Sequence, residues 1–95
     1  MKIVAGFNIG LWESLGFSFD VGDWFEGGHI WYAEKNFDDL ILSIRINTFS
    51  NRTLAKIENL QRQKIGNHVV SEGEALDWFS SRSEGFRLKY ESLSS

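Results

Sequence analysis

The segment Leu40–Asn47 (LILSIRIN) carries the pattern that decides the fold of this 95-residue chain. Its even-numbered positions are apolar and alternate with mostly polar ones, which is the period of a β-strand with one buried face. Ile41 adds an apolar side chain to the otherwise polar face. Because a strand that buries residues on both faces lies inside a sheet, we expect this segment to have a strand on each side.

Three segments before residue 40 also have strand patterns. Ile3–Ile9 and Phe17–Val21 alternate apolar and polar residues, and His29–Lys35 is rich in aromatic residues. The intervening stretches Gly22–Gly28 and Asn36–Asp39 have the composition of a loop and a turn. The third segment and the strand that begins at residue 40 are therefore predicted to form an antiparallel hairpin.

The apolar period changes after residue 50. Leu54, Ile57 and Leu60 recur every three residues within Thr53–Gln63, which predicts an amphipathic helix with Asn51 as its N-cap. We expect this helix to be the first of two.

A second helix is predicted to begin at Ser71. This serine and Glu74 have the spacing of a capping box, with Val70 placed as a hydrophobic staple, and the helix should run to about Ser81. Apolar and charged residues then alternate in Phe86–Glu91, which predicts a closing strand.

The order is thus strands first, then two helices, then a closing strand, which indicates the α+β class. We expect one domain over residues 1–95, with an antiparallel sheet of about four to five strands and two helices packed on one face.

The composition excludes several classes of protein. The chain has no cysteine, which rules out a disulfide scaffold or a thiolate metal site. It has no apolar run near the ~18 residues that a membrane span needs. The first nine residues lack the apolar centre and cleavage site of a signal peptide, so we expect a cytoplasmic protein.

No motif for a catalytic nucleophile, a nucleotide or a metal is present in the sequence. Asp20, Asp23 and Glu26 lie in one glycine-bounded stretch, but their spacing matches no established calcium loop, so we expect no metal and no cofactor. His29 and His68 are the only side chains that titrate near neutral pH without help. A small metal-independent ribonuclease that uses this pair is therefore one alternative.

Several cations occur in or near the first predicted helix: Arg52, Lys56, Arg62 and Lys64. Glu58 lies between them, however, and the whole chain has a net charge of −3. A domain that binds nucleic acid is normally strongly positive, so we expect no nucleic-acid partner.

Acids and aromatic residues gather in the first part of the chain. Residues 1–40 hold seven acids against two bases, and nine of the fourteen aromatic residues fall at or before residue 37. Aromatic side chains ringed by charge are typical of interface hot spots, and acids attract a basic partner. We therefore predict a partner-binding surface that consists of Asp20, Asp23, Trp24, Phe25, Glu26, Trp31, Phe37, Asp38 and Asp39.

These features favour a binding protein over an enzyme. A short, cysteine-free, acidic and aromatic-rich chain resembles bacterial immunity proteins in profile, without a shared motif. We expect an intracellular, antitoxin-like inhibitor that occludes a basic toxin or nuclease domain. The alternatives are a phage-encoded inhibitor of a host defence complex, the ribonuclease above, and a homo-oligomer such as a homodimer that pairs its own aromatic surface.

Overall fold

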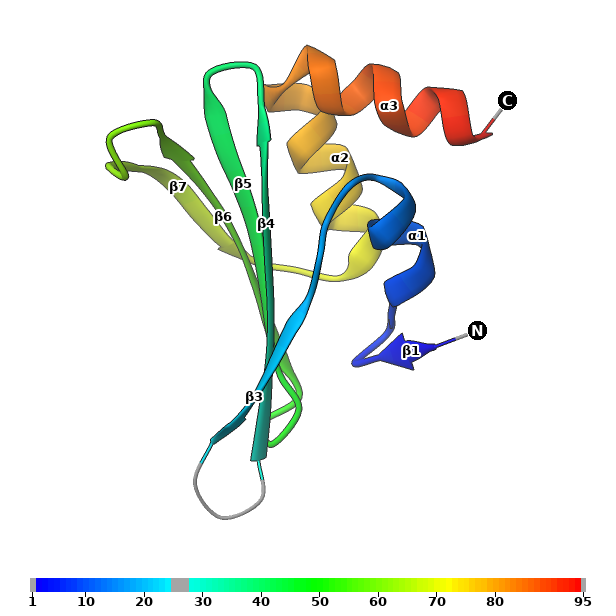
Figure 1. The fold of residues 1–95 in the computed structure, drawn as a ribbon, viewed down its shortest axis with the longest axis vertical. Coiled ribbons are helices and arrows are strands. Elements are labelled where there is room, and N and C mark those ends of the chain that lie inside the picture. The colour runs from blue at the N-terminus through cyan, green and yellow to red at the C-terminus, as the bar shows by residue number, and fades with distance from the viewer. Residues whose placement is uncertain (1, 25–27, 95) are drawn as a thin grey trace.

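Figure 1 shows the computed structural model, which describes residues 2–24 and 28–94. A five-stranded sheet has three helices on one side of it. The elements in chain order are β1 (Ile3–Val4), β2 (Phe7–Asn8), α1 (Ile9–Ser14), β3 (Asp20–Trp24), β4 (Gly28–Phe37), β5 (Leu40–Asn47), β6 (Arg52–Asn59), β7 (Lys64–Val69), α2 (Glu72–Arg82) and α3 (Glu84–Ser94).

The sheet is a meander in which each strand pairs antiparallel with the next, in the order β3-β4-β5-β6-β7. β5 is central and has the predicted bounds, and Ile41 on its second face is buried as expected. The strand predicted at Phe17–Val21 is only partly present, because β3 begins at Asp20 and runs into the predicted loop as far as Trp24. The strand predicted at His29–Lys35 is present as β4, which begins at Gly28 and extends to Phe37 in the predicted turn. The predicted α+β class, with an antiparallel sheet and helices on one face, is confirmed.

The predicted helix at Thr53–Gln63 is wrong, because this segment forms β6 and the turn that leads to β7. Thr53, Ala55 and Ile57 are buried at strand spacing, and each opposes a buried residue of β5. Pairing along the whole of β5 thus outweighs the helical spacing of the leucines and isoleucine. Asn51, predicted as an N-cap, lies in the β5–β6 turn with a φ of 56°.

The predicted strand at Ile3–Ile9 is divided by a turn at Ala5 and Gly6, whose φ angles are 50° and 84°. The two halves form a separate small hairpin, β1 with β2. α1 follows at once, and the Asn8 side chain caps it by accepting a hydrogen bond from Leu11 N at 3.3 Å.

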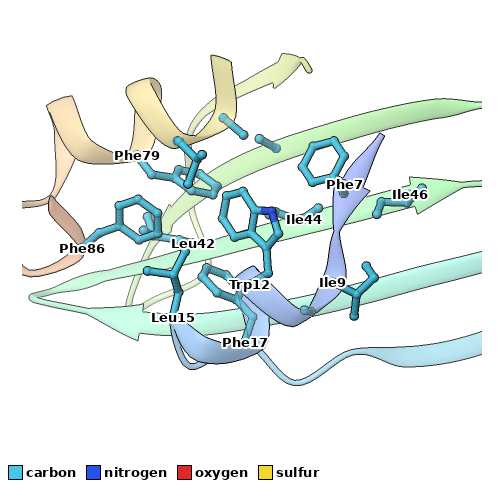
Figure 2. Packing of buried hydrophobic residues seen from close by; sticks show 14 of the residues in the cluster. Phe7, Ile9, Trp12, Leu15, Phe17, Leu42, Ile44, Ile46, Phe79 and Phe86 are labelled. Atoms are coloured by element: carbon cyan, nitrogen blue, oxygen red, sulfur yellow. The ribbon is translucent and has the colours of Figure 1, made fainter. Parts of the chain in front are cut away.

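The core lies between the helices and the sheet, with Trp12 of α1 at its centre (Figure 2). This side chain is fully buried, and its ring centroid lies 5.3–6.1 Å from those of Phe7, Phe17, Phe79 and Phe86. Trp12 Nε1 donates a hydrogen bond to Glu72 Oε2 at 3.1 Å, and Asn8 N donates to the same oxygen at 2.6 Å. One carboxylate therefore joins α1 to the first turn of α2.

α2 begins where predicted, and Ser71 Oγ accepts a hydrogen bond from Glu74 N at 3.4 Å.

The predicted closing strand at Phe86–Glu91 is wrong, because this segment belongs to α3. Phe86 and Tyr90 lie four residues apart, and their rings stack with centroids 6.5 Å apart, as residues on one face of a helix do.

Candidate functional site

The strand register places alternate residues of the sheet on opposite faces. The helices cover the face that carries Ala33, Ile44 and Ala55, which oppose one another across β4, β5 and β6 and are at most 1% exposed. No described helix lies over the opposite face (Figure 1). We call it the open face, and its residues include Asp20, Gly22, Ile30, Tyr32, Glu34, Ile41, Ser43, Arg45, Leu54, Lys56, Glu58, Asn67 and Val69.

Two adjoining hollows lie on the open face. The first has a volume of about 360 Å³ and is lined by Gly22, Ile30, Tyr32, Ser43, Arg45, Leu54 and Lys56. The second, of about 570 Å³, is lined by Arg45, Asn47, Ser50, Arg52, Thr53, Leu54 and Val69. Volumes of a few hundred Å³ suit a small ligand or an anchoring side chain of a partner. Because the hollows share Arg45 and Leu54, they form one continuous surface.

The hollows combine positive charge with apolar walls. Arg45 of β5 and Lys56 of β6 both line the first hollow, and Arg52 lines the second. Ile30 and Leu54 supply apolar surface beside these cations. The arrangement suits a partner group that has an apolar body and a negative charge.

One side of the first hollow is held by a network of ion pairs and hydrogen bonds. Arg62 donates two hydrogen bonds to Glu34, from Nη1 to Oε2 at 2.7 Å and from Nη2 to Oε1 at 2.9 Å. Tyr32 OH donates to Glu34 Oε2 at 2.9 Å. Glu58 lies 3.5 Å from Arg62 Nη1 and 3.7 Å from Lys56 Nζ. Since paired strands carry most of these groups, the network fixes this side of the hollow.

The network shifts two pKa values. The hydrogen bonds from Arg62 hold the pKa of the Glu34 carboxyl below its usual value. Burial, followed by the hydrogen bond to Glu34, raises the pKa of the Tyr32 hydroxyl. At neutral pH Glu34 is therefore ionised and Tyr32 keeps its proton, so the network is intact.

The structure places part of the predicted partner-binding set at the β3–β4 end of the sheet. Asp20 is exposed at the start of β3, opposite Tyr32. The backbones of Asp23 and Trp24 pair with β4 at the far end of β3. Phe25 and Glu26 lie outside the described residues.

Asp38 and Asp39 lie at the opposite end of the sheet, in the β4–β5 turn (Figure 1). Asp20 pairs with Tyr32 and Asp23 with His29, so they lie about 20 Å and about 30 Å along β4 from the turn that holds Asp38 and Asp39. Asp38 Oδ2 also accepts hydrogen bonds from Ser83 Oγ at 2.8 Å and from Gly85 N at 3.1 Å. This aspartate therefore joins the hairpin to the start of α3.

The two remaining predicted residues, Trp31 and Phe37, face the helix layer. Both are half-buried and pack against the core. The Trp31 ring lies 6.3 Å from that of Phe19, with Lys2 Nζ 4.6 Å from its centroid, and the Phe37 ring lies 5.4 Å from that of Phe86. Among the members of the set that the structure describes, Asp20 thus lies on the open face, Asp38 and Asp39 lie in the β4–β5 turn, and Trp31 and Phe37 face the helix layer.

The two histidines are far apart. His68 lies in β7, in register across the sheet with Ala33 of β4, which is four residues from His29. The separation is therefore roughly 14 Å across three strand spacings and about 13 Å along the strands. His68 instead lies 3.5 Å from Glu74 and close to the Trp78 ring. The structure does not bring the two imidazoles together for paired acid–base chemistry.

Sequence reasoning missed the hollows on the open face. It gave Arg45 no role beyond a place on the polar side of its strand, and it assigned Leu54 and Lys56 to different sides of a helix. The alternation of buried Thr53, Ala55 and Ile57 with these residues was the signal that β6 is a strand.

Within residues 2–24 and 28–94, no group of three or more histidine, aspartate or glutamate side chains is placed to hold a metal ion. No helix in the same ranges is long and apolar enough to cross a membrane. No family model matches the chain, and the search of curated proteins and the search of solved structures each found no significant match.

Proposed function

We propose that this protein binds another protein through the open face and thereby blocks the activity of that partner, as an inhibitor of the immunity type does. The observation that carries the proposal is the pair of adjoining hollows on a face without a helix layer. Side chains on paired strands are held in place before binding, which lowers the entropy cost of association. The resemblance in profile to immunity proteins supports the inhibitory role.

The charge of the hollows suggests the chemistry of the partner. Arg45 and Arg52 line them, beside Lys56 that lies 3.7 Å from Glu58, so an acidic surface with an exposed apolar side chain is complementary. The basic partner expected from the sequence depended on the two acidic groups acting together. Because Asp20 and Asp23 lie about 20–30 Å along the sheet from Asp38 and Asp39, and the hollows are lined by cations, we propose an acidic partner for the open face.

Site-specific photo-crosslinking in the native host identifies both the partner and the surface that it contacts. A photoreactive amino acid replaces Leu54 on the open face in one variant and Leu88, which is 53% exposed on α3, in the matched control. We expect one protein to crosslink from position 54 and not from position 88. Crosslinking only from position 88, to a second copy of this chain, or to nucleic acid would overturn the proposal.

Calorimetry with the purified partner then tests the charge of the site. Arg45→Glu is expected to weaken binding by about 2 kcal/mol, which is roughly thirtyfold, because it places a negative charge against an acidic surface. Lys89→Glu makes the same charge change at an exposed position of α3 and should leave the affinity nearly unchanged. Equal effects of the two variants would contradict a contact at the hollows.

A further inference from the structure

β7 is an edge strand with an exposed apolar character. It pairs with β6 on one side only, and among the described residues no strand pairs with its outer side (Figure 1). Ile65 is 56% exposed and Val69 is 66% exposed. Exposed edges of this kind accept further strands, and proteins usually protect them.

The backbone of β7 has hydrogen-bonding groups that point outward. Val70 N donates to Thr53 O of β6 at 3.3 Å, so the backbone groups at this position point toward β6. Because these directions alternate along a strand, the amide and carbonyl groups of Asn67 and Val69 point away from the sheet. A register shift between Ile57 and Glu58 makes the strand irregular near residue 65, so the regular edge runs from residue 66 to residue 69.

An apolar hollow of about 260 Å³ adjoins this edge, between β7 and α2. It is lined by Leu40, Ile57, Ile65, Gly66, Trp78 and Arg82. Gly66 has no side chain, and a Cβ at this position would lie 3.2 Å from the Trp78 ring. The Trp78 ring therefore packs directly against the backbone of Gly66 and borders the hollow at the strand edge.

We propose that an extended segment of a partner protein adds to β7 as a sixth, antiparallel strand. Gly66 opposes Ile57 and directs its own backbone groups inward, so the residue opposite it on the new strand would form a non-hydrogen-bonded pair. Side chains are closest in such pairs, and an apolar side chain there would pack against the Trp78 ring at the border of the hollow. An acidic residue near Arg82, which lines the hollow, completes the match of charge.

A second copy of this chain fits the edge less well. The positions of β7 on the helix-covered face are Gly66 and His68, which oppose Ile57 and Ala55. Pairing of two β7 strands would therefore place either no side chain or an imidazole against the Trp78 ring. The apolar lining favours a segment with leucine, isoleucine or phenylalanine at that position.

The test uses synthetic ten-residue peptides in which leucine alternates with threonine, with aspartate or lysine at one end. Binding is followed by NMR titration and by hydrogen exchange of backbone amides. We expect the leucine–aspartate peptide to bind and to slow exchange at Asn67 and Val69. Replacing its leucines by serine should weaken binding at least tenfold, and Arg82→Glu should reverse the preference between aspartate and lysine.

Asn67→Pro and Asn67→Ala form a matched pair of variants. Proline removes the outward amide without removing a hydrogen bond to β6, whereas alanine keeps that amide. We expect at least tenfold weaker peptide binding for the first and unchanged binding for the second. N-methylation of the backbone amides in alternate residues of the peptide tests the same contact from the other side, and it should abolish binding even if the proline variant does not fold.

The proposal is overturned if no peptide binds at millimolar concentration, if the N-methylated peptide binds equally well, or if the NMR shifts fall on Tyr32, Ser43 and Arg45. This result is separable from the proposed function, because Arg45→Glu should leave peptide affinity unchanged. A bound peptide at β7 together with a failed open-face test would support this inference alone.

Discussion

The two faces of the sheet come from the same five strands, yet they differ in what completes them. On the helix-covered face, small and branched side chains such as Ala33, Ile44 and Ala55 form a surface that α1, α2 and α3 cover. On the open face, Tyr32, Arg45 and other larger polar side chains surround hollows. Burial on the first face stabilises the fold, and the second face is left for contacts with other molecules.

The open face is nevertheless partly ordered by its own side chains. Ile41 and Ser43 are almost fully buried there, although no described helix covers them. They lie in the central strand, so side chains from the strands on both sides shield them from water. The difference between the faces therefore lies in the helix layer and not in the burial of every residue.

The largest predicted effect tests whether the helix layer carries the stability. Trp12→Ala should lower the free energy of unfolding by about 3–5 kcal/mol, because it empties the centre of the core and removes one of the two hydrogen-bond donors to Glu72 Oε2. Urea denaturation followed by circular dichroism measures this loss. Val69→Ala at the exposed edge should change stability by less than about 0.5 kcal/mol, and equal losses would contradict the comparison.

Neighbouring residues of β5 sharpen the same comparison. Ile44 and Ser43 are both at most 2% exposed but lie on opposite faces. Ile44→Ala should lower the free energy of unfolding by about 2–4 kcal/mol, because the shortened side chain leaves a cavity beneath the helices. Ser43→Ala, measured in the same denaturation experiment, should cost about 1 kcal/mol or less. A larger loss for the serine would show that the open face also supports the fold.

Asp38 tests the clamp between the sheet and the helix layer. Asp38→Ala removes the acceptor for Ser83 Oγ and Gly85 N and should destabilise the protein by about 1–2 kcal/mol. Asp38→Asn keeps an acceptor oxygen and a residue type that tolerates the φ of 57°, so its loss should be smaller. Thermal denaturation compares the two, and a similar loss for both would argue against this role.

The smallest effect belongs to the ion pair of the open face. The pKa of Glu34 is lower in the folded state than its unfolded value of about 4.5. The ionised carboxylate therefore adds to the free energy of unfolding above about pH 4.5, and this contribution is lost as the pH falls through the pKa of the folded state. The pair is largely exposed, so Glu34→Gln should cost less than about 1 kcal/mol at pH 7.

Denaturation at about pH 7 and again at about pH 3, well below the usual glutamate pKa, checks this sign. The difference in free energy of unfolding between the wild type and Glu34→Gln should be smaller at the lower pH. Arg62→Gln is the matched variant and should show the same trend. A difference that grows on acidification would mean that the carboxylate is not stabilised in the fold.

Particular segments show how much of the fold the sequence predicts. The bounds of β5 and the start of α2 at Ser71 follow from strong local patterns, which are alternation in the first case and a side-chain cap in the second. Leu54, Ile57 and Leu60 have helical spacing within a segment that forms β6, and Phe86–Glu91 alternates within a segment that forms α3. Short apolar runs of this kind fit either period.

The site was predicted less well than the fold, because its residues come from different strands. Tyr32, Arg45 and Lys56 are spread over twenty-five positions of the chain and meet only through the register of β4, β5 and β6. Asp38 was predicted as an interface residue from its acidic, aromatic-rich surroundings in the sequence. In the structure it accepts a hydrogen bond from Ser83, which is forty-five residues further along the chain. The spacing of residues along the chain carries no information about such long-range contacts.

The sequence by itself determined the α+β class, the central strand and the capped start of the second long helix, because these depend on interactions between residues that are close along the chain. Only the tertiary structure decided the conformation of β6 and α3, the division of the acidic residues between two ends of the sheet, and the hollows of the open face. Each of these depends on which surface a segment meets, and the free energy of that burial exceeds the small local preferences between helix and strand.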